Sequence, residues 1–317
     1  LTGVLSFFLS AALDNMTTAL IMGAVVMAIG RGNPRFVTLS CVSLVVAANA
    51  GGAFSPFGDI TTLMVWQKGK LEFFEFFALF VPSIVNWLVP AAIMVFAVPN
   101  LKPTALPERV TGKPGMMGVV ALFALSIGLA VSFKNFLNLP PALGMMLGLG
   151  LLQMYAYYLS RQGLRRSESD MVLDSFHQVQ RVEWDTLFFF FGIIFAVGGL
   201  GVLGYLSFAS ELLFGGLGPT YANVIIGALS SVVDNIPLMF AVLTMDPPMS
   251  DGQWLLITLT CGTGGSLLAI GSAAGVALMG QARGVYSFSS HLKWTWAVAL
   301  GYIAAIYTHL WINAALF

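Results

Sequence analysis

Charged side chains are scarce in this sequence. Asp, Glu, Lys and Arg make up 9% of its 317 residues, hydrophobic residues make up 58%, and the mean hydropathy is +0.87. Soluble domains carry about 25% charged residues, so this composition excludes an ordinary soluble protein. Two cysteines and three histidines are too few and too scattered for a disulfide framework or a transition-metal site. No nucleophile–base pair is visible, so we expect no enzyme, and we expect no nucleic-acid partner.

What the sequence does contain is long apolar runs. They reach about 20 residues, the length that a helix needs to cross roughly 30 Å of hydrocarbon. The fold class that they predict is an all-α polytopic membrane protein embedded in a lipid bilayer. Plain spans are predicted at residues 73–97, 115–133, 140–159, 184–206 and 292–317. The polar stretch between residues 159 and 184 has apolar residues at helical spacing, which predicts an amphipathic helix on the membrane surface.

Two further apolar segments carry an aspartate and an asparagine in the middle. The pairs are Asp14-Asn15 within residues 1–30 and Asp234-Asn235 within residues 218–245. Each half of such a segment has about 10–14 residues and would be roughly 15–21 Å long, too short to cross a bilayer. We therefore predict two re-entrant hairpins, each with its Asp-Asn pair at the tip.

Gly-rich stretches interrupt two more segments, residues 37–66 and 254–279, which predicts broken transmembrane helices whose free backbone carbonyls line a protected cavity. Hairpin, broken helix and span therefore occur twice in the same order, an internal repeat typical of secondary transporters. The predicted parts are a first repeat at 1–97, scaffold spans, loops and the surface helix at 98–183, and a second repeat at 184–317. The second repeat begins with a span that the first lacks, so N-terminal spans are expected to be missing from this chain.

The basic residues predict the orientation. If each hairpin returns to its own side, three of the 14 Lys and Arg residues fall on one face, namely Lys68, Lys70 and Lys134. The others fall on the opposite face: Arg31, Arg35, Lys102, Arg109, Lys113, Arg161, Arg165, Arg166, Arg181, Arg283 and Lys293. The positive-inside rule then makes the first hairpin open to the cytoplasm and the second to the outside. The repeats would be inverted, and the C-terminus would lie outside.

Asp14, Asp59 and Asp234 stand at the predicted midplane with no Lys or Arg nearby in the sequence. A charge there costs about 2.5–3.5 kcal/mol, which favours a function for these carboxylates. Neutral oxygen donors cluster around them: Ser10, Asn15, Thr17, Asn49, Thr61, Thr62, Ser230, Asn235, Ser266 and Ser272. Carboxylates, hydroxyls and amides suit a hard cation such as Na⁺ or Li⁺. Asp14, Asn15, Asn49 and Asp59 are the expected principal Na⁺ ligands.

The same carboxylates explain proton coupling without any cofactor. A carboxyl group removed from water binds a proton more readily, so H⁺ and Na⁺ would compete for one set of oxygens. Competition of this kind, combined with alternating access, is antiport. An Asp-Asn pair could also be only a helix N-cap, but two pairs, each followed by a Gly-rich break, favour a site. His177, His291 and His309 stand alone in the sequence and are expected to be structural.

The segments "DNMTTALI", "NAGGAFSPFGDITTLMVW", "FFFFGIIFAVGGLG", "SSVVDNIPL" and "GTGGSLLAIGSAAGV" closely resemble the NhaD-type sodium/proton antiporters of bacteria. The resemblance implies Na⁺(Li⁺)/H⁺ exchange across the inner membrane by a homodimer, in which a mobile domain moves against a scaffold. It places the polar motif of the family on Ser10, Asp14, Asn15, Thr17, Asn49, Asp59, Thr61, Thr62, Ser230, Asn235 and Ser272, with Asp185 as a charged position on the preceding span. Ala269 stands where the family usually has a serine.

Two other functions stay open at this stage. A Na⁺-coupled symporter of an anionic metabolite such as a dicarboxylate would share the fold, although an anion should avoid the three buried aspartates. A membrane scaffold or sensor would transport nothing, and its polar residues could be replaced by apolar ones with a gain of stability. We favour the antiporter, whose partners are the lipid bilayer and monovalent cations.

Overall fold

The computed structural model describes residues 1–30, 32–98, 115–166 and 184–317, and every regular element within them is a helix. Five of the described helices are long and apolar enough to cross a membrane, and one bent helix pair would make a sixth span. The prediction of a polytopic helical membrane protein is therefore confirmed. The contacts divide the chain into two units, Leu1–Leu106 with Phe190–Phe317 and Pro107–Phe189.

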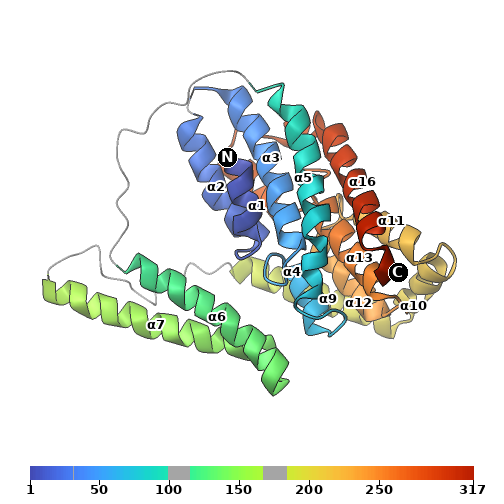
Figure 1. The fold of residues 1–317 in the computed structure, drawn as a ribbon, viewed down its shortest axis with the longest axis horizontal. Helices are drawn as coiled ribbons and strands as arrows, with labels where there is room; N and C mark the ends of the chain where they lie inside the picture. The colour runs from blue at the N-terminus through green and yellow to red at the C-terminus, as the bar shows by residue number, and fades with distance from the viewer. Residues whose placement is uncertain (31, 99–114, 167–183) are drawn as a thin grey trace. The chain divides into compact units, whose positions relative to one another are not determined.

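The unit Pro107–Phe189 contains a pair of long helices joined by a short turn (Figure 1). They are α6 (Met116–Leu137) and α7 (Pro141–Arg166). Gly144 lies against the backbone of Ala130, and Gly148 lies against Ser126. Small residues thus bring the two helices together, as in many membrane helix pairs. The predicted surface helix lies largely in residues 167–183, outside the described residues.

The first half of the larger unit has two interrupted helical segments followed by a span. Its elements are α1 (Thr2–Ser10), α2 (Asn15–Ile29), α3 (Pro34–Ala53), α4 (Ile60–Gln67), η1 (Glu75–Leu79) and α5 (Phe80–Val95). The predicted interruption at Asp14-Asn15 is present, because α1 ends at Ser10 and α2 begins at Asn15. The predicted break of the next segment lies between α3 and α4.

The second half repeats this order after an additional helix. Its elements are α9 (Trp184–Val202), α10 (Tyr205–Ser210), η3 (Glu211–Gly215), α11 (Pro219–Leu229), α12 (Asn235–Met245), α13 (Asp251–Gly264), α14 (Ala273–Gln281), α15 (Phe288–Leu292), α16 (Thr295–Ile312) and η4 (Ala314–Leu316). The predicted span 184–206 is too long at its end. Gly204, at φ 84°, ends it, and the following helical segment is bent by 82° from α9.

Each half contains the same close backbone contact. A Cβ atom at Gly51 would collide with the carbonyl oxygen of Phe7, and one at Gly264 would collide with that of Gly227. Because these glycines have no side chain, α1 lies directly on α3 and α11 lies directly on α13. The first helix of each interrupted segment is therefore held against the helix that leads into the Gly-rich break.

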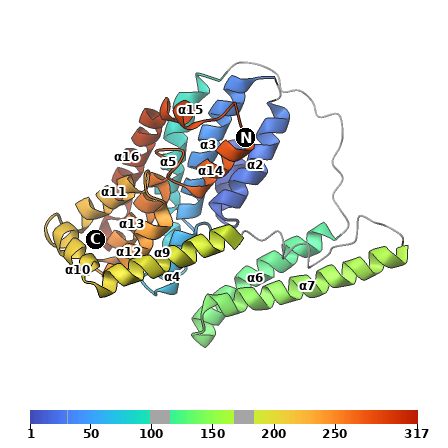
Figure 2. The ribbon, with the colours of Figure 1, turned by 180° about the vertical axis from the view of Figure 1, so that it is seen from behind.

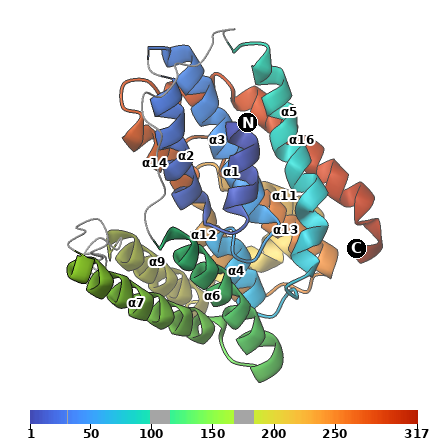
Figure 3. The same cartoon turned by 60° about the vertical axis from the view of Figure 1, so that its left-hand side comes forward.

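Helices from the two halves also pack on each other. Helix α2 lies beside α14, and α4 lies beside α12 (Figures 2 and 3). The Gln281 side chain donates to the carbonyl oxygen of Leu20 at 3.1 Å. At the far ends of α4 and α12, Lys70 pairs with Asp246. Each half thus supplies a helix that completes the packing of the other half.

Candidate cation site

Asp59 is the centre of a buried polar network. Its side chain is 4% exposed, and it stands at the N-cap of α4, immediately after the first Gly-rich break. One carboxylate oxygen accepts a hydrogen bond from the backbone N–H of Thr61 at 3.0 Å. Aspartate is a favoured N-cap because it satisfies a free N–H of the first turn. The local sequence therefore fixes where the carboxylate points, and leaves its second oxygen for other partners.

Two asparagines reach that second oxygen from opposite halves of the chain. Asn15 donates to Oδ2 of Asp59 at 2.9 Å, and Asn235 donates to the same atom at 3.0 Å. Each is the first residue of its helix, α2 or α12, and each follows an aspartate at the N-cap. The two Asp-Asn pairs thus occupy equivalent places, and both amides converge on one carboxylate.

Asn49 connects this carboxylate to the second Gly-rich break. Its Oδ1 accepts from Asn15 at 3.0 Å, and its Nδ2 donates to Ser272 Oγ at 3.0 Å and to the Val45 carbonyl at 3.0 Å. Ser272 is the N-cap of α14. The first turns of α2, α4, α12 and α14 therefore meet at one network, and the positive ends of their helix dipoles face a single buried carboxylate.

The network has the donor set of a hard-cation site. It contains carboxylate, amide and hydroxyl oxygens, which bind Na⁺ and Li⁺ well. The hydroxyl of Thr61 is fully buried beside the Asp59 carboxylate and adds a further oxygen to this donor set. Among those residues no group of three or more His, Cys, Asp and Glu side chains could hold a metal ion. These donors suit an alkali cation better than a transition metal.

Asp14 and Asp234 are less buried than Asp59 and stand beside the network rather than in it. Both carboxylate oxygens of Asp14 accept from Thr17, one from its backbone N–H and one from its hydroxyl. Asp14 thus caps its own helix, α2. Asp234 occupies the same place before α12. Asp185 lies in α9, and its side chain is outside the described part of the chain.

The predicted hydroxyl ligands mostly donate to backbone carbonyls. The acceptors are Ala48 O for Ser10, Gly227 O and Cys261 O for Ser230, Ser55 O and Asp59 O for Thr62, and Thr263 O for Ser266. These bonds fix the interrupted helices and the two breaks in place. The four hydroxyls thus support the network through the backbone.

Two residues that contact the site from outside could not be identified from the sequence. Cys261 donates from Sγ to the carbonyl oxygen of Asn235 at 3.3 Å. His291 contacts the carbonyl oxygen of Ser266, in the second break, at 2.9 Å. The partner of each residue is a backbone carbonyl, so no pattern of side chains in the sequence could predict these two contacts.

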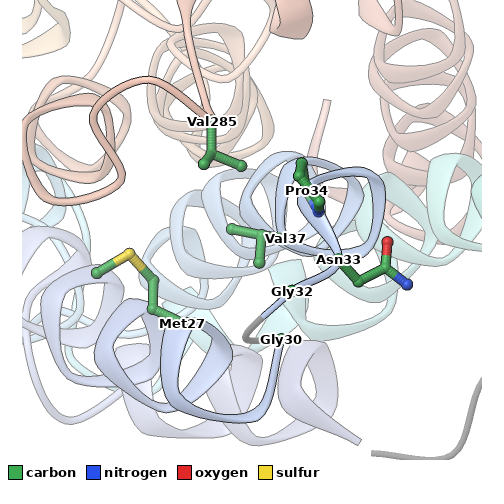
Figure 4. A pocket seen from close by; sticks show the side chains of 7 residues that line it. All are labelled: Met27, Gly30, Gly32, Asn33, Pro34, Val37 and Val285. Atoms are coloured by element: carbon green, nitrogen blue, oxygen red, sulfur yellow. The ribbon is translucent and has the colours of Figure 1, made fainter.

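A surface pocket lies at the other end of α2, where the chain turns into α3. Met27, Gly30, Gly32, Asn33, Pro34, Val37 and Val285 line it (Figure 4). Its lining includes no carboxylate and none of the predicted site residues, and Asn33 already caps α3 by accepting from Phe36 N–H. We therefore assign no function to this pocket.

An apolar helical membrane protein whose interrupted helices meet around a buried carboxylate has the architecture of a secondary transporter. Comparison with known proteins agrees. Residues 1–262 match the citrate transporter family, CitMHS. The chain is 55% identical to the Na(+)/H(+) antiporter NhaD of Alkalimonas amylolytica over 100% of this chain and 70% of that protein. It is 55% identical to NhaD of Vibrio parahaemolyticus over 95% of this chain and 78% of that protein.

A more distant relative is sodium/proton antiporter 2 of Arabidopsis thaliana, 32% identical over 98% of this chain and 76% of that protein. The chain belongs to the NhaD antiporters within the CitMHS transporter family. The family expected from the sequence motifs is thereby confirmed, and the relatives carry the names of transporters rather than enzymes.

Proposed function

We propose that this protein exchanges Na⁺, or Li⁺, for H⁺ across the membrane, and that both ions use the Asp59 carboxylate. The observation that carries the proposal is the burial of Asp59, 4% exposed, with three donors from its own helix and from both halves of the chain. The names of the NhaD relatives support the same exchange. A proton and a cation cannot share the same carboxylate oxygen, so binding of one expels the other.

The two asparagines beside Asp59 can adapt to either ion. Asn15 and Asn235 present amide N–H groups to Asp59 in the present conformation. A half-turn of each amide replaces the N–H by Oδ1, which converts a hydrogen-bond donor into a cation ligand. Asn49 and Thr61 add further oxygens, and Ser272 and Ser266 belong to the pseudo-symmetric side of the site. Asp14 and Asp234 supply negative charge beside it, and Asp185 stays a predicted charged position on the preceding helix.

Alternating access would follow from the arrangement of the halves. In our proposal, α1–α2 and α11–α12 are re-entrant hairpins of two inverted repeats, residues 1–97 and 184–317, and residues 98–183 belong to the scaffold. The repeated order of elements and the equivalent glycine contacts support this. We also propose a homodimer, in which the part that carries both hairpins moves against the scaffold.

The basic residues support an orientation in the bacterial inner membrane. Arg35 and Arg283 follow α2 and α14, which pack side by side, whereas Lys68 and Lys70 follow α4, which packs beside α12. We place the first pair of residues in the cytoplasm and the second pair outside. The first hairpin then opens to the cytoplasm, and the C-terminus lies outside.

The test is proton flux in everted membrane vesicles, followed with a ΔpH-sensitive dye. With the unsubstituted protein, addition of Na⁺ should dequench the dye. With Asp59→Asn, the fluorescence should stay the same, because the amide cannot take up a proton. Asp246→Asn is the matched control, since that carboxylate pairs with Lys70 at the end of α12. Dequenching at the normal rate with Asp59→Asn would contradict the proposal, provided that both variants elute as folded protein.

A second candidate function is Na⁺-coupled uptake of an anionic metabolite, and the name of the matching family, citrate transporter, is the observation that favours it. Asp14, Asp59 and Asp234 oppose it, because three carboxylates repel a polyanion. Uptake of labelled citrate or succinate into proteoliposomes that depends on a Na⁺ gradient would support the symporter. If uptake is no greater than uptake into protein-free vesicles, the symporter is refuted and cation exchange stays as the proposed function.

A further inference from the structure

A buried histidine and tyrosine hold the second Gly-rich break from outside. After α14 the chain turns through Tyr286 into α15, which carries His291. One imidazole nitrogen, Nε2, lies 2.9 Å from the carbonyl oxygen of Ser266, and the other, Nδ1, lies 2.7 Å from the hydroxyl of Tyr286. His291 is 1% exposed and Tyr286 is 2% exposed. Water therefore does not compete for these two hydrogen bonds.

The partners fix the tautomer of the ring. A carbonyl oxygen only accepts, so Nε2 of His291 carries the hydrogen that Ser266 O receives. Burial lowers the pKa of His291 and raises the pKa of Tyr286, so the imidazole is neutral and the phenol keeps its hydrogen. Nδ1 then accepts from the Tyr286 hydroxyl. The phenol thus orients the ring, and the ring orients the carbonyl.

A neighbouring carbonyl is held in the same way. Thr295, at the start of α16, donates from Oγ1 to the carbonyl oxygen of Leu267 at 2.8 Å. Two successive carbonyls of the break are thus occupied by donors from α15 and α16. The break continues to Ser272, whose hydroxyl accepts from Asn49 in the polar network. A change in the direction of these carbonyls would therefore move Ser272 and alter its hydrogen bond to Asn49.

The first break lacks the histidine–tyrosine pair. At the offset that relates Gly51 to Gly264, Phe73 stands in the place of Tyr286 and Ala78 in the place of His291. Phe73 packs its ring against Phe57 of the first break, with ring centroids 6.1 Å apart. The first break is thus held by aromatic packing and by Thr62, which donates to the carbonyl oxygen of Ser55 at 2.8 Å, whereas the second break is held by donors from α15 and α16. The two sides of the pseudo-symmetric site are therefore not chemically equivalent.

We propose that His291, oriented by Tyr286, is a positioning residue for cation binding, which sets the direction of the Ser266 carbonyl and thereby the shape of the second break around the ion. This inference rests on the proposed function, because it assumes that the second break borders the cation. Backbone carbonyls at such breaks are typical cation ligands in transporters, and those engaged by His291 and Thr295 have one lone pair fewer for that role and a fixed direction. The remaining oxygens determine which cation fits.

The experiment is equilibrium binding of ²²Na⁺ to the purified full chain, with Li⁺ as competitor. His291→Leu should weaken Na⁺ binding about tenfold, as loss of an outer-shell partner does at many metal sites, and should change the Na⁺:Li⁺ preference. His291→Gln should recover much of the loss, because its amide N–H can reach the same carbonyl. Tyr286→Phe should give a smaller loss in the same direction.

The matched control is His309→Leu. His309 is also buried, and its Nε2 lies 3.0 Å from the carbonyl oxygen of Gly252, far along the chain from either break. This variant should lose stability without a change in Na⁺ affinity or in the Na⁺:Li⁺ preference. The inference is overturned if folded His291→Leu and Tyr286→Phe bind both ions as the unchanged protein does, if His291→Gln recovers none of the loss, or if His309→Leu alters the preference equally. Because binding is measured, absence of exchange by the unchanged protein would refute the proposed function without deciding this point.

Discussion

Asp59 lies inside an apolar bundle, and its donors explain how it can stay there. A buried carboxylate is costly unless donors surround it, and hydrogen bonds to a charged group are worth about 1.5–3 kcal/mol each. Asn15 and Asn235 each supply one such bond, but Asn15 also holds Asn49. The two amides therefore occupy equivalent positions in the two halves, but only Asn15 also makes a hydrogen bond to Asn49.

This inequality can be measured. Asn15→Ala should weaken Na⁺ binding by about tenfold or more, since 1.4 kcal/mol corresponds to a factor of about ten. Asn235→Ala should weaken it less, because Asn49 keeps its place. Asn313→Ala serves as the control, since Asn313 donates to the carbonyl oxygen of Ala78, outside the network. Equal Na⁺ affinity in all three variants, measured by isothermal titration, would refute the role of the amides.

The residue types around Asp59 could be predicted from the sequence, and their individual roles could not. Aspartate and asparagine are good N-caps as well as good cation ligands, so the pattern cannot separate the two uses. Asp14 caps α2 through Thr17, and its role as a principal Na⁺ ligand stays a prediction, because a capping carboxylate can also bind a cation. His291 stands alone in the sequence, which predicts a structural residue, and its contact with the second break could not be predicted because the partner is a backbone carbonyl.

At the scale of the helices, backbone contacts at glycines determine where the breaks lie. The carbonyl oxygens of Phe7 and Gly227 leave no room for a side chain at Gly51 and Gly264. The breaks could be predicted because glycine repeats at the same spacing in both halves. The turn at Gly204 could not, since many apolar spans contain glycine without bending, and the contacts that select the bend are tertiary.

Gly264→Ala and Gly262→Ala form a matched pair on α13. The first should cost about 1–3 kcal/mol, because the new methyl group would collide with the Gly227 carbonyl and push α11 away. The second should be neutral or slightly stabilising, since a Cβ at Gly262 would lie 3.6 Å from the Cβ of Ala53, an ordinary contact. Thermal unfolding of the two purified variants measures the difference. A similar melting temperature for both would contradict the contact.

At the scale of the whole molecule, the orientation in the membrane can be tested with single cysteines. Lys68 and Arg283 are both exposed, and Cys41 and Cys261 are both fully buried and should not react. A membrane-impermeant maleimide should label Lys68→Cys in right-side-out vesicles and Arg283→Cys in everted ones. The unmodified protein is the control for background. Labelling of both positions from the same side would refute the inverted arrangement of the halves.

The packing of α2 on α14 and of α4 on α12 has a consequence for biosynthesis. Helix α2 leaves the ribosome long before α14 exists, and at about 5–20 residues per second the delay is on the order of 10–50 s. During that interval Asp14 and Asn15 enter the membrane without their final neighbours. The newly made α1–α2 segment must therefore wait in a protected place, such as the insertion machinery, until α14 is made and packs against it.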